Sequence, residues 1–198
     1  LGGLLGKKTP RSQVDLSGAG YNGVYTRGGA SADTAMDMGD QVMRTLRDFA
    51  KQMGMSLDSS VDLGVLGQRG KKFFYDPRTG LGNRQYGDPK QYRYKEAEDA
   101  VAAAIKDALL KGVVTGLSEA SKSILRTTRD INAALQEVAE LETAARSIDK
   151  GLMAIKDPVR AEITALVDAQ NERAALAVKA GVELAKIEEL NGLERQAA

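Results

Sequence analysis

Two glycine-rich stretches near the N-terminus have residue types that bind nucleotides in other proteins. Residues 18–23 read Gly-Ala-Gly-Tyr-Asn-Gly, with the glycine spacing of a dinucleotide-binding loop, and residues 6–9 read Gly-Lys-Lys-Thr, close to a phosphate loop. A dinucleotide loop follows an apolar strand and opens a helix. No apolar strand precedes residue 18, residues 24–29 cannot open a helix, and lysine occupies the Ser/Thr position of the phosphate loop. We interpret both stretches as linkers and predict no cofactor and no small-molecule substrate.

The chain contains neither cysteine nor histidine. This removes thiolate nucleophiles, imidazole bases and zinc sites with Cys or His ligands. Carboxylates are plentiful, but they lie on predicted helices with cations nearby, as on an ordinary solvated face: Glu96, Glu98, Glu119, Glu137, Glu140 and Glu142. We predict no catalytic residue and no metal site, and therefore no enzyme.

A basic segment is the best local candidate for contact with nucleic acid. Cations there stand beside three aromatic residues at 73–75, so lysine and arginine could meet phosphates while rings stack on bases. The alternative is an edge strand protected by lysine, with its rings over a small core. The formal net charge of +1 gives no overall field that favours nucleic acid. The candidate residues are Arg69, Lys71, Lys72, Arg78 and Arg84.

Composition changes sharply near residue 95, because every aromatic residue lies at or before Tyr94 and no glutamate precedes Glu96. Residues 1–30 are rich in Gly, Ser and Lys, and we predict an extended lead-in there. Residues 31–126 predict a small α+β module, and residues 127–198 a helical segment with a coiled coil. The expected fold class is mainly α with a small β meander.

Within the module, Ser31 is a candidate N-cap for a helix over 32–53, whose methionine-rich stripe should face a core. Alternating apolar residues predict strands near 61–66 and 71–75, with an edge strand near 91–94. Helical spacing resumes at Ala97 and ends at Gly112, and a short helix follows near 117–125. Because so few strands cannot stand alone, the sheet must lie on helices or on another subunit.

The last third of the chain has the spacing of a coiled coil. Thr127 is a candidate N-cap with Asp130 at the third helical position, and Asp157-Pro158 marks the start of a final helix. Apolar residues recur every seven positions in two series offset by three, which predicts a self-association seam. The seam comprises Ile131, Ala134, Val138, Leu141, Ala145, Ile148, Leu152 and Ile155.

Residues 30–140 resemble the C-terminal region of tail tape measure proteins from long-tailed phages and gene transfer particles. The resemblance lies in the Met/Ala helix after the Gly/Ser-rich stretch, the hairpin at 61–75, and the segments 97–105, 112–118 and 125–135. It implies a protein made in the bacterial cytoplasm that sets tail length in the virion tail and organises the tip before DNA delivery. Implied partners are further copies, as a homotrimer, and tail tube, distal tail or baseplate hub proteins.

Two other functions fit the same residues. One is a nucleic-acid-associated protein that uses the basic segment, so DNA remains a possible partner. The other is an unrelated coiled-coil assembly protein. Because the chain begins with Leu1 rather than methionine, we expect a piece of a longer polypeptide.

Overall fold

The computed structural model describes residues 9–78, 92–179 and 193. The chain divides into two compact units, residues 1–143 and residues 144–198. The first unit therefore extends past the boundary predicted after residue 126, into the helix that follows. Its described strands are β1 (Arg11–Ser17), β2 (Gly20–Arg27), β3 (Asp62–Arg69), β4 (Lys72–Asp76) and β5 (Tyr92–Tyr94), and its described helices are α1 (Asp33–Gln52), α2 (Ala97–Leu110), α3 (Glu119–Thr127) and the first half of α4 (Ile131–Lys156).

The five strands form one antiparallel sheet in the order β2-β1-β3-β4-β5. The prediction of an extended lead-in is wrong for residues 11–27, because β1 is an interior strand that pairs on both sides. Of the glycines of residues 18–23, Gly18 lies in the turn between β1 and β2, whereas Gly20 and Gly23 lie in β2, so this stretch is part of a hairpin and not the predicted linker. The predicted strand near residues 91–94 is confirmed as β5, which lies at the edge of the sheet.

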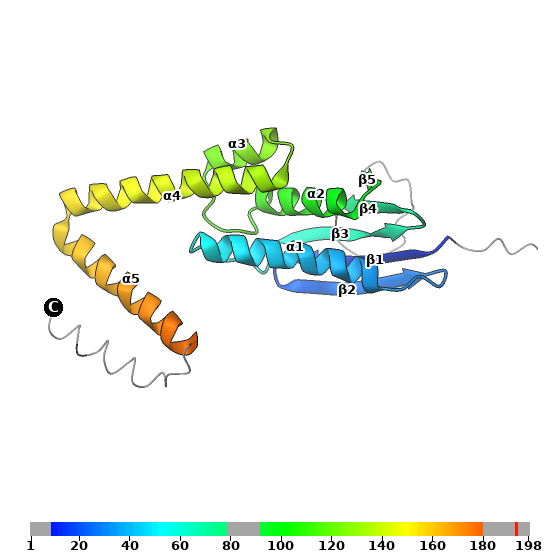
Figure 1. Cartoon of the computed structure of the whole chain (residues 1–198), viewed down its shortest axis with the longest axis horizontal. Coiled ribbons are helices and arrows are strands. Elements are labelled where there is room, and N and C mark those ends of the chain that lie inside the picture. The colour runs from blue at the N-terminus through cyan, green and yellow to red at the C-terminus, as the bar shows by residue number, and fades with distance from the viewer. Residues whose placement is uncertain (1–8, 79–91, 180–192, 194–198) are drawn as a thin grey trace, which may run out of the picture. The chain divides into compact units, whose positions relative to one another are not determined.

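Helices α1 and α2 lie side by side over one face of the sheet (Figure 1). Alternation along the strands sends Val14, Leu66 and Tyr75, which are neighbours in register, into the core beneath the helices. Leu46 of α1 and Leu109 of α2 are completely buried in the same core. Helices α1 and α2 thus cover one face of the sheet, in agreement with the prediction that the sheet lies on helices or on another subunit.

Helix α1 confirms the predicted amphipathic helix, and Met38, Met43 and Met53 are buried along it. Met36 is an exception, because 39% of it is exposed. Ser31 lies just before the helix, where its Oγ accepts a hydrogen bond from the backbone N–H of Asp33 at 3.1 Å. The helix itself begins at Asp33, one residue later than predicted, and Ala32 rather than Ser31 is its N-cap residue.

The hydroxyl of Tyr75 joins α2 to the sheet through polar contacts. The Tyr75 hydroxyl lies within hydrogen-bonding distance of the Asp107 carboxylate on α2 and of the Leu63 carbonyl oxygen on β3, the latter at 2.8 Å. Burial, then the charge of Asp107, raises the pKa of Tyr75 well above its ordinary value. The phenol is therefore a neutral structural group at physiological pH.

Helix α4 begins three residues later than predicted. Asp130 accepts hydrogen bonds from the backbone N–H groups of Asn132 and Ala133, at 2.8 and 3.1 Å, and so acts as the cap itself. Thr127 instead ends α3, where its hydroxyl donates to the carbonyl oxygen of Ser123 at 3.0 Å. A carboxylate directly before the first helical residue can accept from the N–H groups of the first turn, whereas the hydroxyl of Thr127 lies three residues farther back.

The second unit contains the end of α4 and helix α5 (Pro158–Lys179). Asp157 caps α5 as predicted, because its carboxylate accepts the backbone N–H of Arg160 at 3.1 Å and Pro158 occupies the first helical position. Among the described residues, no helix combines the length and apolar character needed to cross a membrane.

Candidate assembly surface and cation row

The predicted heptad seam divides into a buried and an exposed half. Ala134 and Val138 are buried in the core of the first unit and are 1% and 0% exposed, with Ile131 and Leu141 half-buried beside them. For Ala134 and Val138, the prediction that another copy covers the seam is wrong. The reason is that the first unit already fills that side of α4, so these side chains stabilise the fold.

The later seam positions lie on the surface of the second unit. Ile148 is 63% and Ile155 is 82% exposed, and Ala145 and Leu152 are exposed as well. Helix α5 continues in the same manner, with exposed aliphatic residues at helical spacing: Val159, Ile163 and Val167. We call the six large residues the aliphatic stripes: Ile148, Leu152 and Ile155 on α4, and Val159, Ile163 and Val167 on α5.

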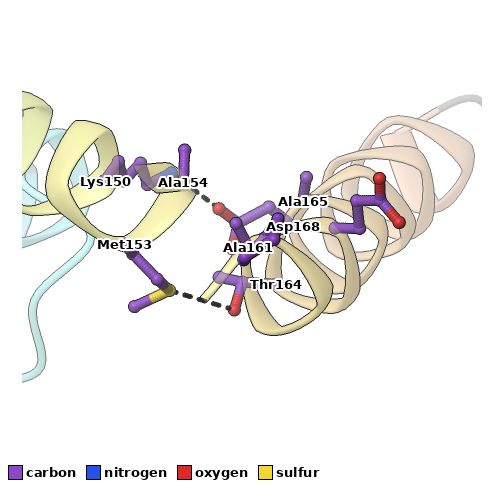
Figure 2. A pocket seen from close by; sticks show the side chains of 9 residues that line it. Lys150, Met153, Ala154, Ala161, Thr164, Ala165 and Asp168 are labelled. Carbon is purple, nitrogen blue, oxygen red and sulfur yellow. Dashed lines mark hydrogen bonds and ion pairs between the residues drawn. The ribbon is translucent and has the colours of Figure 1, made fainter. Parts of the chain in front are cut away.

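Two polar contacts join the end of α4 to α5. Lys150 Nζ lies 2.7 Å from a carboxylate oxygen of Asp168, and the Thr164 hydroxyl donates to the sulfur of Met153 at 3.8 Å. Between the helices is a pocket of about 440 Å³. In Figure 2, α4 forms the left side of the pocket and α5 the right side. The lining includes alkyl groups of Met153, Ala154, Pro158, Ala161 and Ala165. Such a hollow suits an aliphatic side chain better than a charged substrate.

The basic candidates named from the sequence do not act as one group. Arg69 ends β3 and its register partner is Lys72 at the start of β4, so these two lie together, while Lys71 is exposed in the turn between them. Arg78 forms a bidentate ion pair with the buried carboxylate of Asp76, with nitrogen–oxygen distances of 2.9 and 2.8 Å. Arg84 lies outside the described residues.

Two arginines that sequence reasoning missed stand in line with Arg69. Arg11 of β1 is the register partner of Arg69 on one side and of Arg27 of β2 on the other. We call Arg27, Arg11, Arg69 and Lys72 the cation row. The alternation of Gln13, Val14, Asp15 and Leu16 was the available signal for β1, but only two of these residues are apolar.

Comparison with known proteins adds no relative. No protein-family model matches the chain, and no match is found among curated proteins or among solved structures. Within the described part of the chain, no three acidic residues gather closely enough to hold a metal ion. The aliphatic stripes and the cation row are therefore the features from which a function can be inferred.

Proposed function

We propose that this chain is a structural assembly protein that associates with copies of itself through the second unit, as part of a tape measure in a phage-type tail. In this role it occupies the tail lumen or tip, together with tail tube, distal tail or baseplate hub proteins. It performs no catalysis and uses no cofactor. The tail assignment rests on the resemblance of residues 30–140, and the self-association on the surface of the second unit.

The single observation that carries the self-association is the exposure of the aliphatic stripes. Isolated helices are marginal in water, and helices in proteins gain most of their stability from packing an apolar face. Here Ile148, Ile155 and Val159 are each more than half exposed. Covering an aliphatic side chain of this size contributes about 1.5–3 kcal/mol. A second copy is the partner we favour, because the exposed residues of α4 continue the heptad series that began at Ile131.

The residue types on α4 favour more than two copies. In the heptad series, Leu152 occupies the first core position, and Ile148 and Ile155 occupy the second. In parallel coiled coils, leucine at the first position with isoleucine at the second shifts the preference from dimers to trimers and tetramers. This supports the homotrimer that the resemblance implies.

We expect the full chain to sediment at about three times its chain mass of 21.1 kDa. Replacing both isoleucines in Ile148→Asn/Ile155→Asn should shift the population to monomers, because each chain then loses two aliphatic contacts of about 1.5–3 kcal/mol. Analytical ultracentrifugation over a range of concentrations measures both states.

The control is Ser147→Asn/Asp149→Asn, which places the same new residue at the two exposed positions on either side of Ile148 in α4. It leaves the stripe and the lining of the pocket intact, so the trimer should persist. A wild-type chain that remains monomeric at high concentration would refute self-association, and so would equal dissociation of the two variants.

The tail role predicts a length effect in assembled particles. A tape measure transmits its own length, so duplicating the 22 residues of α5 should lengthen the tail by about 33 Å, at 1.5 Å for each helical residue. Electron microscopy of negatively stained tails measures this. A duplication outside the helices, at residues 54–60, serves as the control and should leave the length nearly unchanged. Tails of equal length in all three cases, or tails that lack the chain, would contradict the proposal.

A further inference from the structure

One end of the sheet carries four cations side by side on consecutive strands. Register places Arg27 opposite Arg11, Arg11 opposite Arg69, and Arg69 opposite Lys72. Register partners point to the same face, and adjacent strands lie about 4.8 Å apart, so the cation row extends over about 14 Å. Like charges directly opposite one another destabilise a sheet.

The cation row lies on the sheet face opposite α1 and α2. The guanidinium of Arg11 lies 5.0 Å from the centroid of the Phe74 ring, so Arg11 and Phe74 are on the same face of the sheet. Phe74 alternates along β4 with Tyr75, whose side chain faces the helices. The cation row is therefore separate from the hydrophobic core and from the second unit's aliphatic stripes.

Three members of the row meet at a pocket of about 120 Å³, whose described lining residues are Thr9, Arg11, Arg27 and Arg69. Its volume is about four times the share of one water molecule in the liquid, which suits one tetrahedral oxyanion. Guanidinium groups bind such anions through paired N–H donors, and the Thr9 hydroxyl adds a further donor. None of these four lining residues is acidic.

The electrostatics of Arg11 agree with this geometry. Burial lowers the pKa of Arg11 most, and the neighbouring charge of Arg69 lowers it further, while Asp76 acts in the opposite direction. The sheet thus holds Arg11 beside both a further cation, Arg69, and the Asp76 carboxylate.

We propose that the cation row binds the phosphate backbone of a nucleic acid, with one phosphate in the pocket between Arg11, Arg27 and Arg69. Lys72 continues the row beyond the pocket's lining, so the row accommodates more charge than a single phosphate offers. A nucleic-acid strand supplies one phosphate at each nucleotide along a continuous chain. The row contacts phosphates, which carry no base identity, so binding is independent of sequence.

The test is fluorescence anisotropy of the full chain with a labelled oligonucleotide of mixed sequence. Two phosphates neutralised on duplex DNA, one in the pocket and one at Lys72, predict that affinity falls about 10-fold between about 50 and about 200 mM salt. In Arg27→Gln/Lys72→Gln, only the phosphate between Arg11 and Arg69 remains, and the fall should be only about 3-fold over the same interval. Both replaced residues are exposed, so the fold should survive their replacement, and circular dichroism checks that it does.

The matched control is Arg44→Gln/Arg47→Gln, which removes the same charge from the exposed surface of α1. It should keep the salt dependence of the wild-type chain. Equal losses in the two variants would overturn the proposal, because they would indicate a general charge effect. Binding of polyglutamate as tight as that of the oligonucleotide would assign the row to an acidic protein instead, and binding of inorganic phosphate at equal affinity would reduce it to a single-anion site.

Discussion

A Gly64→Ala variant is expected to lose about 3–5 kcal/mol of unfolding free energy, because two penalties combine at this position. Gly64 has a φ of +97°, a conformation that an L side chain rarely adopts. A methyl group there would also lie 2.3 Å from the carbonyl oxygen of Asp76 and 2.9 Å from the Cα of Pro77. Both are backbone atoms of the neighbouring strand's end, so the strands must separate. Urea unfolding followed by circular dichroism measures the loss.

Gly70→Ala separates the two penalties. Gly70 also has a positive φ, +59°, but the nearest atom to an added methyl group is the Cγ2 of Thr9 at 3.5 Å, an ordinary contact. Only the conformational cost remains, about 1–2 kcal/mol. If Gly64→Ala destabilised the protein no more than Gly70→Ala, the close approach of β3 to the end of β4 would be contradicted.

The second large effect is expected at Glu142, which is 6% exposed and joins α4 to the start of α3. One carboxylate oxygen accepts the backbone N–H of Ser118 at 2.8 Å and the hydroxyl of Ser121 at 2.6 Å. Its negative charge also lies at the positive end of α3. Glu142→Ala leaves these two donors without this acceptor, at about 1–3 kcal/mol each, so we expect a loss of about 2–5 kcal/mol in thermal or urea unfolding.

Two companion variants test the assignment of that loss. Glu142→Gln keeps a carbonyl oxygen able to accept from both donors, so it should cost clearly less than the alanine variant. Glu140→Ala removes an exposed carboxylate two residues earlier, which accepts a surface hydrogen bond from Gln136 at 3.1 Å. Its effect should stay within about 0.5 kcal/mol. Similar losses for Glu140→Ala and Glu142→Ala would contradict the role of the Ser118–Ser121 contact.

Much of the secondary structure could be predicted, because its signals are local. The Asp157-Pro158 pair starts α5 through a cap that needs only four consecutive residues. The period of α1 and α2 and the apolar strands β3 and β4 were likewise visible in short windows. The carboxylate of Glu142, in contrast, was interpreted as solvated and is buried. Its position on α4 is not informative by itself, because the donors it meets come from α3.

Strand β1 shows why the lead-in prediction failed. Gln13 and Asp15 are buried along with Val14 and Leu16, so both faces of the strand are covered. A strand buried on both faces is normally recognised by a run of apolar residues, and a strand buried on one face by alternation of apolar and polar residues. Strand β1 is covered on both faces but has polar residues on one of them, so it does not have the apolar run that would have identified it. Its place in the sheet comes from pairing with β2 and β3.

By itself, the sequence determined that α5 begins at Asp157-Pro158, that α1 has an apolar face, and that the chain contains no cysteine or histidine. Only the tertiary structure decided that Ala134 and Val138 serve the chain's own core while Ile148 and Ile155 remain on the surface. It also brought Arg11 and Arg27 into line with Arg69. The physical reason is that caps and periodicity act within one or two turns, whereas burial and charge clustering depend on which distant segments pack or pair.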